Sequence, residues 1–285
     1  MNLENLKAFR FPSIVHRYTA TDSILYALGL GFGERPADPM HLQFVYENGL
    51  RAVPSMCMVL AHPGFWIDSP SLQIDWIKLV HGEQSFELLQ PLSPEGSVRG
   101  EYEIVAVEDK GPDKGASLHL VKRLFDLATD APIALVRSVY LLRGDGGHGG
   151  FGVAPQPPPV LPDGSPDVFV DIRTLPQSAL IYRLSGDKNP IHADPASAAR
   201  AGFPQPILHG LCSMGIAARG IIETLAAGDP GRLRGVSVRF SKPVVPGETL
   251  RVEIFGRASE IRFRVRSVER GILVLDRGSA RVDPS

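Results

Sequence analysis

The feature that most limits the folds open to this sequence is an internal repeat, with one copy on each side of a stretch rich in glycine and proline. Residues 90–104, QPLSPEGSVRGEYEI, resemble residues 242–254, KPVVPGETLRVEI, because each has a proline, a Pro/Gly turn and then an alternating strand. Two further pairs keep the same order: Val53–Met58 with Leu208–Met214, which matches Cys57 to Cys212, and Tyr18–Asp22 with Tyr182–Asp187. Similarity that keeps its order along the chain predicts two related halves that arose by duplication.

The stretch between the halves, residues 143–167, reads RGDGGHGGFGVAPQPPPVLPDGSPD. Its glycines give way to prolines without apolar periodicity, which is typical of a linker that is flexible first and then stiff. A glycine cluster that cradles phosphates would need a strand before it and a helix after it, and that context is missing here. We therefore predict an N-terminal domain over residues 1–145, a linker over 146–165 and a C-terminal domain over 166–285.

Each half is predicted to hold one apolar helix followed by several strands. In the C-terminal half, residues 208–227, LHGLCSMGIAARGIIETLAA, are apolar on nearly every side, and Gly228 and Pro230 end the run. Alternating segments rich in β-branched residues surround it: DVFVDIRTL, RGVSVRF, ETLRVEIFG, IRFRVRSVE and ILVLDRGSARV. A long buried helix wrapped by an antiparallel sheet is an α+β fold, and the repeat predicts a tandem of two.

Composition narrows the class of function. Apolar residues make up 44% and charged residues 21% of the chain, as in a soluble globular protein, and the net charge is −1. That charge argues against a nucleic-acid partner, which requires a basic surface. No apolar run reaches the ~20 residues of a membrane span. The first residues, MNLENLKAFRFP, lack the layout of a secretory signal, and the final DPS is not a peroxisomal Ser-Lys-Leu, so we expect a cytoplasmic protein.

A short turn in the C-terminal half, YRLSGDKNPIHADP, gathers an acid, an amide and a base around a proline: Asp187, Asn189 and His192. Such a turn also has a purely structural explanation, because Asp and Asn bond their own backbone and Pro fixes φ. The residues that follow favour chemistry. Asp194-Pro195 opens a short helix, and an extended segment then leads to Gly210 near the start of the long helix.

Free backbone N–H groups at a helix start favour negative charge, and a glycine there lets a ligand approach closely. An acid, a base and a donor for oxyanion charge together suit chemistry on a carbonyl compound. The N-terminal half keeps the frame but loses these groups, since no Asn-Pro-x-His follows Asp22, and Pro54 and Ser55 stand where His209 and Gly210 stand. One active half and one degraded half therefore describe an enzyme that gained binding space by duplication.

Other chemistries fit the residues less well. His192-x-Asp194 could begin a metal site, but no third ligand lies at a telling spacing, so we expect no metal. A Ser-His-Asp hydrolase would need a Gly-x-Ser-x-Gly elbow. Cys212 could be an activated thiol, yet its apolar neighbours favour a packed, reduced cysteine, as for Cys57.

The segment YRLSGDKNPIHADPASAARAGFPQPILHGL closely resembles the signature of the MaoC-like, type 2 (R-specific) enoyl-CoA hydratases. YTATDSILYALGLG, LVHGEQSFELLQPL and the GGFG after RGDGGH resemble the two-domain members, so the resemblance covers most of the chain. It implies a double hot-dog fold, in which each half is a long helix wrapped by an antiparallel sheet. It also implies reversible hydration of a trans-2-enoyl-CoA to a (3R)-3-hydroxyacyl-CoA in fatty acid metabolism such as β-oxidation, with no separate cofactor.

The resemblance also assigns residues. By it, Asp187 and His192 hold the reacting water, Asn189 helps to orient that water, and the Gly210 N–H holds the thioester oxygen. Which of Asp187 and His192 is the base stays open, because the two should titrate as a coupled pair. The positions that match those binding CoA and the acyl chain are His81, Gly82, Lys110 and Phe240.

Several expectations rest on the resemblance with little or no support from the residues alone. A homodimer is one of them. Lys110 could be only a solvated loop charge, His81-Gly82 only a strand-end turn, and Phe240 only core. Arg262, Arg264 and Arg266 lie at alternate positions, and we interpret them as a solvated sheet face rather than a nucleotide clamp. The alternatives to hydration are a dehydratase for a branched or dicarboxylic acyl-CoA, a hot-dog thioesterase and a non-catalytic acyl-CoA-binding protein.

Overall fold

The structure is a computed structural model that describes residues 1–156, 158, 160–256 and 259–284. Its α-helices are α1 (Leu3–Ala8), α2 (Ala20–Gly29), α3 (Pro39–Leu42), α4 (Ser178–Tyr182), α5 (Pro195–Arg200) and α6 (Gly210–Thr224). Six 3-10 turns accompany them: η1 (Pro54–Met58), η2 (Trp66–Asp68), η3 (Trp76–Lys78), η4 (Arg183–Ser185), η5 (Pro190–His192) and η6 (Pro230–Arg232). The strands of the N-terminal half are β1 (Ile14–Tyr18), β2 (Leu79–Leu88), β3 (Gly96–Asp109), β4 (Ala116–Asp126), β5 (Pro132–Leu142) and β6 (Phe151–Gly152). Those of the C-terminal half are β7 (Val168–Arg173), β8 (Leu233–Phe240), β9 (Thr249–Phe255), β10 (Glu260–Ser267) and β11 (Ile272–Val282).

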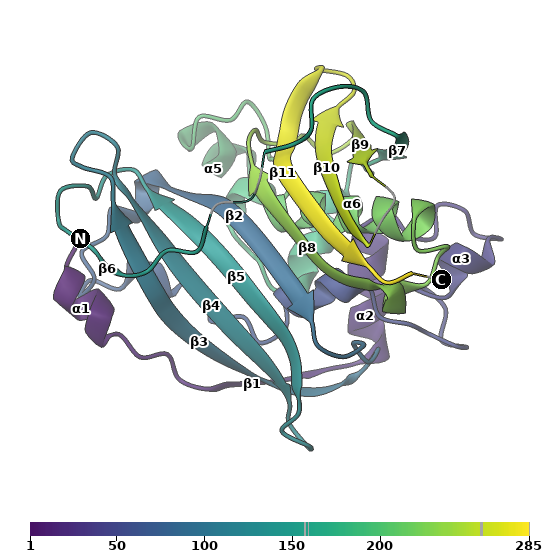
Figure 1. The fold of residues 1–285 in the computed structure, drawn as a ribbon, viewed down its shortest axis with the longest axis horizontal. Coiled ribbons are helices and arrows are strands. Elements are labelled where there is room, and N and C mark those ends of the chain that lie inside the picture. The colour runs from purple at the N-terminus through teal and green to yellow at the C-terminus, as the bar shows by residue number, and fades with distance from the viewer. Residues whose placement is uncertain (157, 159, 257–258, 285) are drawn as a thin grey trace.

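All these strands form one antiparallel sheet in the order β1-β3-β4-β5-β2-β8-β11-β10-β9-β7, with β6 paired to β3 (Figure 1). The two halves meet where β2 pairs with β8, and Phe86 lies opposite Val236 at this seam. One apolar core runs under both halves. The predicted α+β double hot-dog architecture is therefore confirmed, with the two sheets joined edge to edge. No helix within the described ranges is long and apolar enough to cross a membrane.

The stretch between the halves starts as an ordered segment. Asp109 accepts hydrogen bonds from the N–H groups of Gly147 (2.8 Å) and Gly149 (2.6 Å), and Phe151 pairs with Val107 on β3. The glycine-rich beginning of the stretch thus differs from the flexible linker that composition predicts, because a carboxylate outside the stretch binds its backbone.

The long helix of the C-terminal half is present as predicted. Helix α6 is buried along most of its length and packs against β7, β8 and β9. Its glycines let it approach its neighbours closely. A Cβ on Gly220 would lie 3.0 Å from Val170 and 3.2 Å from Val252, and one on Gly215 would lie 2.6 Å from Leu30.

The N-terminal half differs from the expectation of a long helix in each half. Its counterpart of α6 is the single buried 3-10 turn η1, Pro54–Met58. Ala61 has a left-handed φ of 51°, and His62 precedes Pro63, a position that disfavours the helical conformation. The carbonyl groups that a continuing helix would have satisfied accept hydrogen bonds from the Lys122 ammonium on β4 instead: Cys57 (2.8 Å), Met58 (2.9 Å) and Leu60 (2.8 Å).

Lys122→Met should lower the free energy of unfolding by about 1–3 kcal/mol at pH 7, because buried carbonyl groups would lose their donor. Burial lowers the pKa of Lys122 from 10.5 to about 8. Between these pH values the folded protein binds fewer protons than the unfolded chain, so the wild type gains stability as the pH rises. The free energy of unfolding of the wild type, relative to that of the variant, should rise by roughly 1 kcal/mol per pH unit between pH 8 and 10. Urea unfolding at pH 7, 8 and 9 tests this, with the exposed Arg123→Met as control; a difference that stays constant with pH would contradict it.

The two halves correspond in a register that differs from the one read from the sequence. Tyr18 ends strand β1, whereas Tyr182 ends helix α4, so these residues are not equivalent. Tyr26 of α2 is the counterpart of Tyr182. Both rings are fully buried and pack with centroids 5.6 Å apart, and the spacing from Tyr26 to Pro39 equals that from Tyr182 to Pro195.

An ion-pair network around one buried arginine also joins the halves. Arg219, fully buried on α6, pairs with Glu223 (2.6 Å) and with Glu34, and donates to the carbonyl oxygen of Leu30 (3.1 Å). It fixes the loop after α2 onto the central helix of the other half.

Candidate active site

The turn 186–195 is held by the side chains of its own residues. The Asn189 N–H donates to Asp187 Oδ1 (3.1 Å), and the Ile191 N–H donates to Asn189 Oδ1 (3.2 Å). Asp194 caps α5 by accepting from the N–H groups of Ala196 and Ser197. The structural and the catalytic interpretations of this turn are therefore compatible, because these hydrogen bonds shape the turn that carries Asp187 and His192.

His192 is nearly buried and has a defined tautomer. Its Nδ1 lies 2.8 Å from the carbonyl oxygen of Ile207, which can only accept, so Nδ1 carries the hydrogen. Nε2 therefore has a free lone pair and can accept a proton. Burial lowers the pKa of His192 below its usual 6.5, while the Ile207 contact and the nearby Asp187 charge raise it by less. At neutral pH the ring is uncharged.

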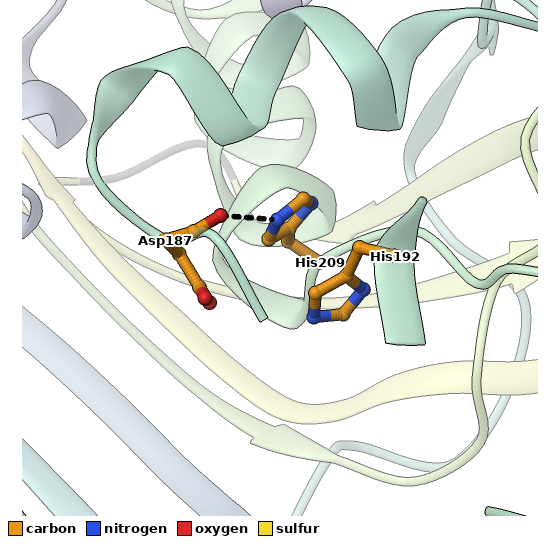
Figure 2. Close-up of side chains that lie close together, drawn as sticks. All are labelled: Asp187, His192 and His209. Atoms are coloured by element: carbon orange, nitrogen blue, oxygen red, sulfur yellow. Dashed lines mark hydrogen bonds between the residues drawn. The ribbon is translucent and has the colours of Figure 1, made fainter. Parts of the chain in front are cut away.

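A third residue completes the cluster. Figure 2 shows His209 between the main chain of Asp187 and the ring of His192. One side-chain ligand atom from each of Asp187, His192 and His209 lies within 4.8 Å of the other two. The two imidazole rings are stacked, with centroids 3.7 Å apart and planes 24° apart. The His209 Nε2–H donates to the Asp187 carbonyl oxygen (3.1 Å).

This cluster has the residue types of a metal site but not its geometry. The lone pairs of imidazole nitrogens lie in the ring planes, so two nearly parallel stacked rings direct them side by side rather than toward one ion. In addition, the hydrogen bond to Asp187 occupies His209 Nε2. A zinc ion requires nitrogen atoms at about 2.0–2.1 Å around one centre. The arrangement suits proton transfer better than chelation.

Gly210 begins α6, as predicted, and is exposed. No side chain among the described residues caps this helix start. Its N–H groups are therefore available to a ligand oxygen, and the helix dipole adds positive potential there. The ring of Phe240 covers the glycine so closely that a Cβ on Gly210 would lie 3.1 Å from it.

His81 joins this wall from the other half. Its ring centroid lies 5.0 Å from that of Phe240 and 5.0 Å from that of Tyr140, and Nε2 lies 3.0 Å from Gln84 Oε1. Burial lowers the pKa of His81 to about 4, so the ring is neutral. Gly82 packs tightly under Leu141, where a Cβ would lie 2.8 Å away.

The predicted residues are therefore brought together to different degrees. One side-chain ligand atom of Asp187 lies within 4.8 Å of one of His192. Beside them, Phe240 contacts both Gly210 and His81, and these three residues form one wall of the site. The side-chain oxygen of Asn189 accepts a hydrogen bond from the Ile191 N–H within the turn. Lys110 lies in the hairpin between β3 and β4, its Nζ 3.6 Å from Glu108, and its role in binding stays a prediction.

The N-terminal half could not hold a second set of these groups. In the corrected register Gly31 stands at the position of Asp187 and Pro36 at that of His192. Gly31 has a left-handed φ of 84°, and a Cβ there would lie 2.6 Å from Arg219 Nη1. The ion pairs that join the halves thus occupy the space of the lost carboxylate.

Two of the remaining expectations agree with the structure. Cys57 and Cys212 are free and buried, and burial raises both thiol pKa values, that of Cys57 to about 12. Neither is an activated thiol. Arg264 and Arg266 pair with Glu253 on the neighbouring strand, as expected of a sheet face rather than a nucleotide clamp, although the Glu253 side chain is nearly buried rather than solvated.

The functional residue that sequence reasoning missed is His209. From the sequence alone it is named only as a neighbour of Gly210, although an imidazole in an otherwise apolar segment is a signal for a functional role. Tyr140 and Gln84 carry no such signal, since polar residues are common in a strand.

Two family profiles match nearly the whole chain. Residues 159–277 match the MaoC like domain, and residues 16–144 match the MFE-2 hydratase 2 N-terminal domain. The probable enoyl-CoA hydratase 2 of Dictyostelium discoideum is 38% identical, over 96% of this chain and 94% of its own length.

Two further proteins show the range of architectures in which the unit occurs. The peroxisomal multifunctional enzyme type 2 of Mus musculus is 33% identical over 97% of this chain, which spans only 38% of that longer protein. The crystal structure of a MaoC-like dehydratase from Phytophthora capsici superposes with a TM-score of 0.88 at 31% identity, covering all of both chains.

Proposed function

This chain belongs to the family of MaoC-like enoyl-CoA hydratases with an MFE-2 hydratase 2 N-terminal domain, and we propose that it adds water reversibly to trans-2-enoyl-CoA. It is a hydro-lyase acting on acyl-CoA. The observation that carries the proposal is the proximity of the Asp187 carboxylate to the His192 ring, whose Nε2 is left free, beside the uncapped start of α6.

In the proposed mechanism one water is held between Asp187 and His192. The pair removes one proton from that water, the hydroxyl oxygen bonds to Cβ, and the pair returns a proton to Cα. Negative charge develops on the thioester oxygen meanwhile, and the Gly210 N–H stabilises it. Since hydroxyl and proton arrive from one water, they add to the same face. The family resemblance implies which face this is, that of the (3R)-3-hydroxyacyl-CoA product. The reaction needs no redox cofactor, because no electrons are transferred.

Binding of the substrate is assigned to the wall beside Gly210. The neutral His81 ring and Phe240 would contact the thioester end and the acyl chain. Gly82 lets the β2 backbone lie close to Leu141 on β5. Lys110 supplies a cation for a CoA phosphate. A branched or dicarboxylic acyl-CoA remains the alternative substrate for the same chemistry.

The test is the loss of enoyl-thioester ultraviolet absorbance with trans-2-enoyl-CoAs of increasing chain length, followed by chiral analysis of the product. Saturable loss that gives the (3R) product without free CoA is expected. Release of free thiol would instead indicate a thioesterase, and binding without turnover across the series would indicate a non-catalytic acyl-CoA-binding protein.

The pH dependence of kcat/KM should show an acid limb below pH 6.5 and a plateau at neutral pH. The active form has neutral His192, which exists above its pKa, and burial places that pKa below 6.5. Activity is therefore lost as the pH falls through the lowered value. Initial rates from pH 4.5 to 8.5 give the profile, and an acid limb with its midpoint above pH 7 would contradict a buried, neutral base.

We further propose that the protein is a cytoplasmic homodimer in fatty acid metabolism. The family resemblance supports the dimer and the pathway. The relative from Mus musculus is named peroxisomal. Light scattering coupled to size exclusion, and fractionation of the cells that make the protein, test these two properties directly.

A further inference from the structure

His209 occupies an unusual position for its residue type. It is the N-cap of α6, a position that favours Ser, Thr, Asp or Asn because their side chains bond to the first N–H groups of the helix. The His209 side chain makes no such bond and turns away from the helix. The first-turn N–H groups, including that of Gly210, thus stay free for the substrate.

Residues 207–210 contact both residues that are proposed to hold the water, Asp187 and His192. The Ile207 carbonyl fixes the tautomer of His192, and the His209 Nε2–H holds the main chain of Asp187. The His209 ring stacks on that of His192, and Gly210 follows directly. The backbone of this segment is itself fixed, because the Leu208 N–H donates to the Val244 carbonyl (2.8 Å).

His209 is not suited to transfer protons itself. Its ring is almost fully buried, and its Nε2–H is used on a carbonyl group. Burial, followed by the neighbouring His192, lowers its pKa to about 4, so it remains neutral where the enzyme would work. Its Nδ1 is buried without a hydrogen-bond partner within the described part of the chain. Burying a nitrogen without a partner costs stability. We infer that the ring is kept for its two other contacts, the hydrogen bond from Nε2–H and the stacking on His192.

We propose that His209 is a positioning residue, which holds the Asp187 main chain and the His192 ring in register with the Gly210 N–H. This inference rests on the proposed hydratase function. It predicts that loss of the Nε2–H donor lets the Asp187 turn shift relative to the helix start. A misplacement of about 1 Å lowers turnover by about 10²-fold.

The test compares variants that separate the donor from the ring. His209→Phe keeps a stacking ring without the donor, and His209→Gln keeps a side-chain N–H at a similar reach without the ring. We expect the Phe variant to lower kcat by about 10²-fold with KM changed less than about threefold. The Gln variant should recover at least tenfold of that loss. His209→Asn, too short to reach Asp187, should behave like Phe if the Phe variant does not fold.

The control is Ser55→Ala, which removes a buried hydrogen bond to Tyr26 at the matching place in the other half. It should lower the Tm but leave kcat unchanged. Equal kcat in the wild type and the Phe and Asn variants, or equal loss in Phe and Gln, would overturn the positioning role. A wild type that hydrates no enoyl-CoA would refute the proposed function instead, so the two failures are distinguishable.

Discussion

His192→Ala should lower kcat for hydration by about 10²–10⁴-fold, the range by which a positioned acid or base accelerates a reaction. Only the Nε2 lone pair of His192 is free, because Nδ1–H is bound to the Ile207 carbonyl. Alanine removes that lone pair without disturbing the hydrogen bonds of Asp187 and Asn189 that shape the turn. Continuous absorbance assays at saturating enoyl-CoA measure the loss of kcat.

Asp187→Asn should give a loss of the same order, since it keeps an oxygen that can accept from the Asn189 N–H but removes the charge. The two losses should not add in the double variant, because the residues act on one water. Lys188→Ala lies in the same turn, is exposed and serves as the control with near wild-type rates. Folded His192→Ala protein with a wild-type kcat would contradict the account.

Gly210→Pro should lower kcat by about 10²–10³-fold, the effect of removing one oxyanion donor. Proline removes the N–H of this residue but fits the first position of a helix. The preceding His209 already has φ −59° and ψ 137°, a conformation that proline accepts in its neighbour. The fold should therefore persist while the donor is lost.

Gly210→Ala is the matched control, because it retains the N–H and adds only a Cβ near the Phe240 ring, at 3.1 Å. We expect it to lose no more than about tenfold in kcat, since the ring must shift by only a few tenths of an ångström. Steady-state kinetics of both variants, with circular dichroism to check folding, separate the donor from the added bulk. Equal activity of the Pro and Ala variants would show that the N–H is not the oxyanion donor.

The sequence predicts those parts of the fold whose signals are local. The apolar run that becomes α6, the alternating strands around it and the Asp194-Pro195 helix start are all read from neighbouring residues. The loss of the long helix in the N-terminal half could not be predicted in this way. Pro63 is a local signal against a long helix, but the donor that satisfies the carbonyl groups of the shortened turn is Lys122, which lies 65 residues from the Cys57 carbonyl that it binds.

The same distinction holds at the site. Asp187, Asn189 and His192 share one short turn, so their spacing in the sequence alone predicts that they lie close together. His209 is joined to Asp187 across 22 residues, and its role appears only when the helix start folds against the turn. The predicted match of Tyr18 to Tyr182 was wrong for a similar reason. The true counterpart, Tyr26, is identified by its packing against Tyr182 and not by the residues around it in the sequence.

In the proposed mechanism a single water, held between Asp187 and His192, supplies both the hydroxyl group and the proton. Hydration of trans-2-enoyl-CoA in D2O, followed by proton NMR of the C2–C3 coupling in the product, tests it most directly. We expect one deuterium at C2 and only the syn diastereomer of the (3R) product. An anti product, or a mixture of the two diastereomers, would contradict it.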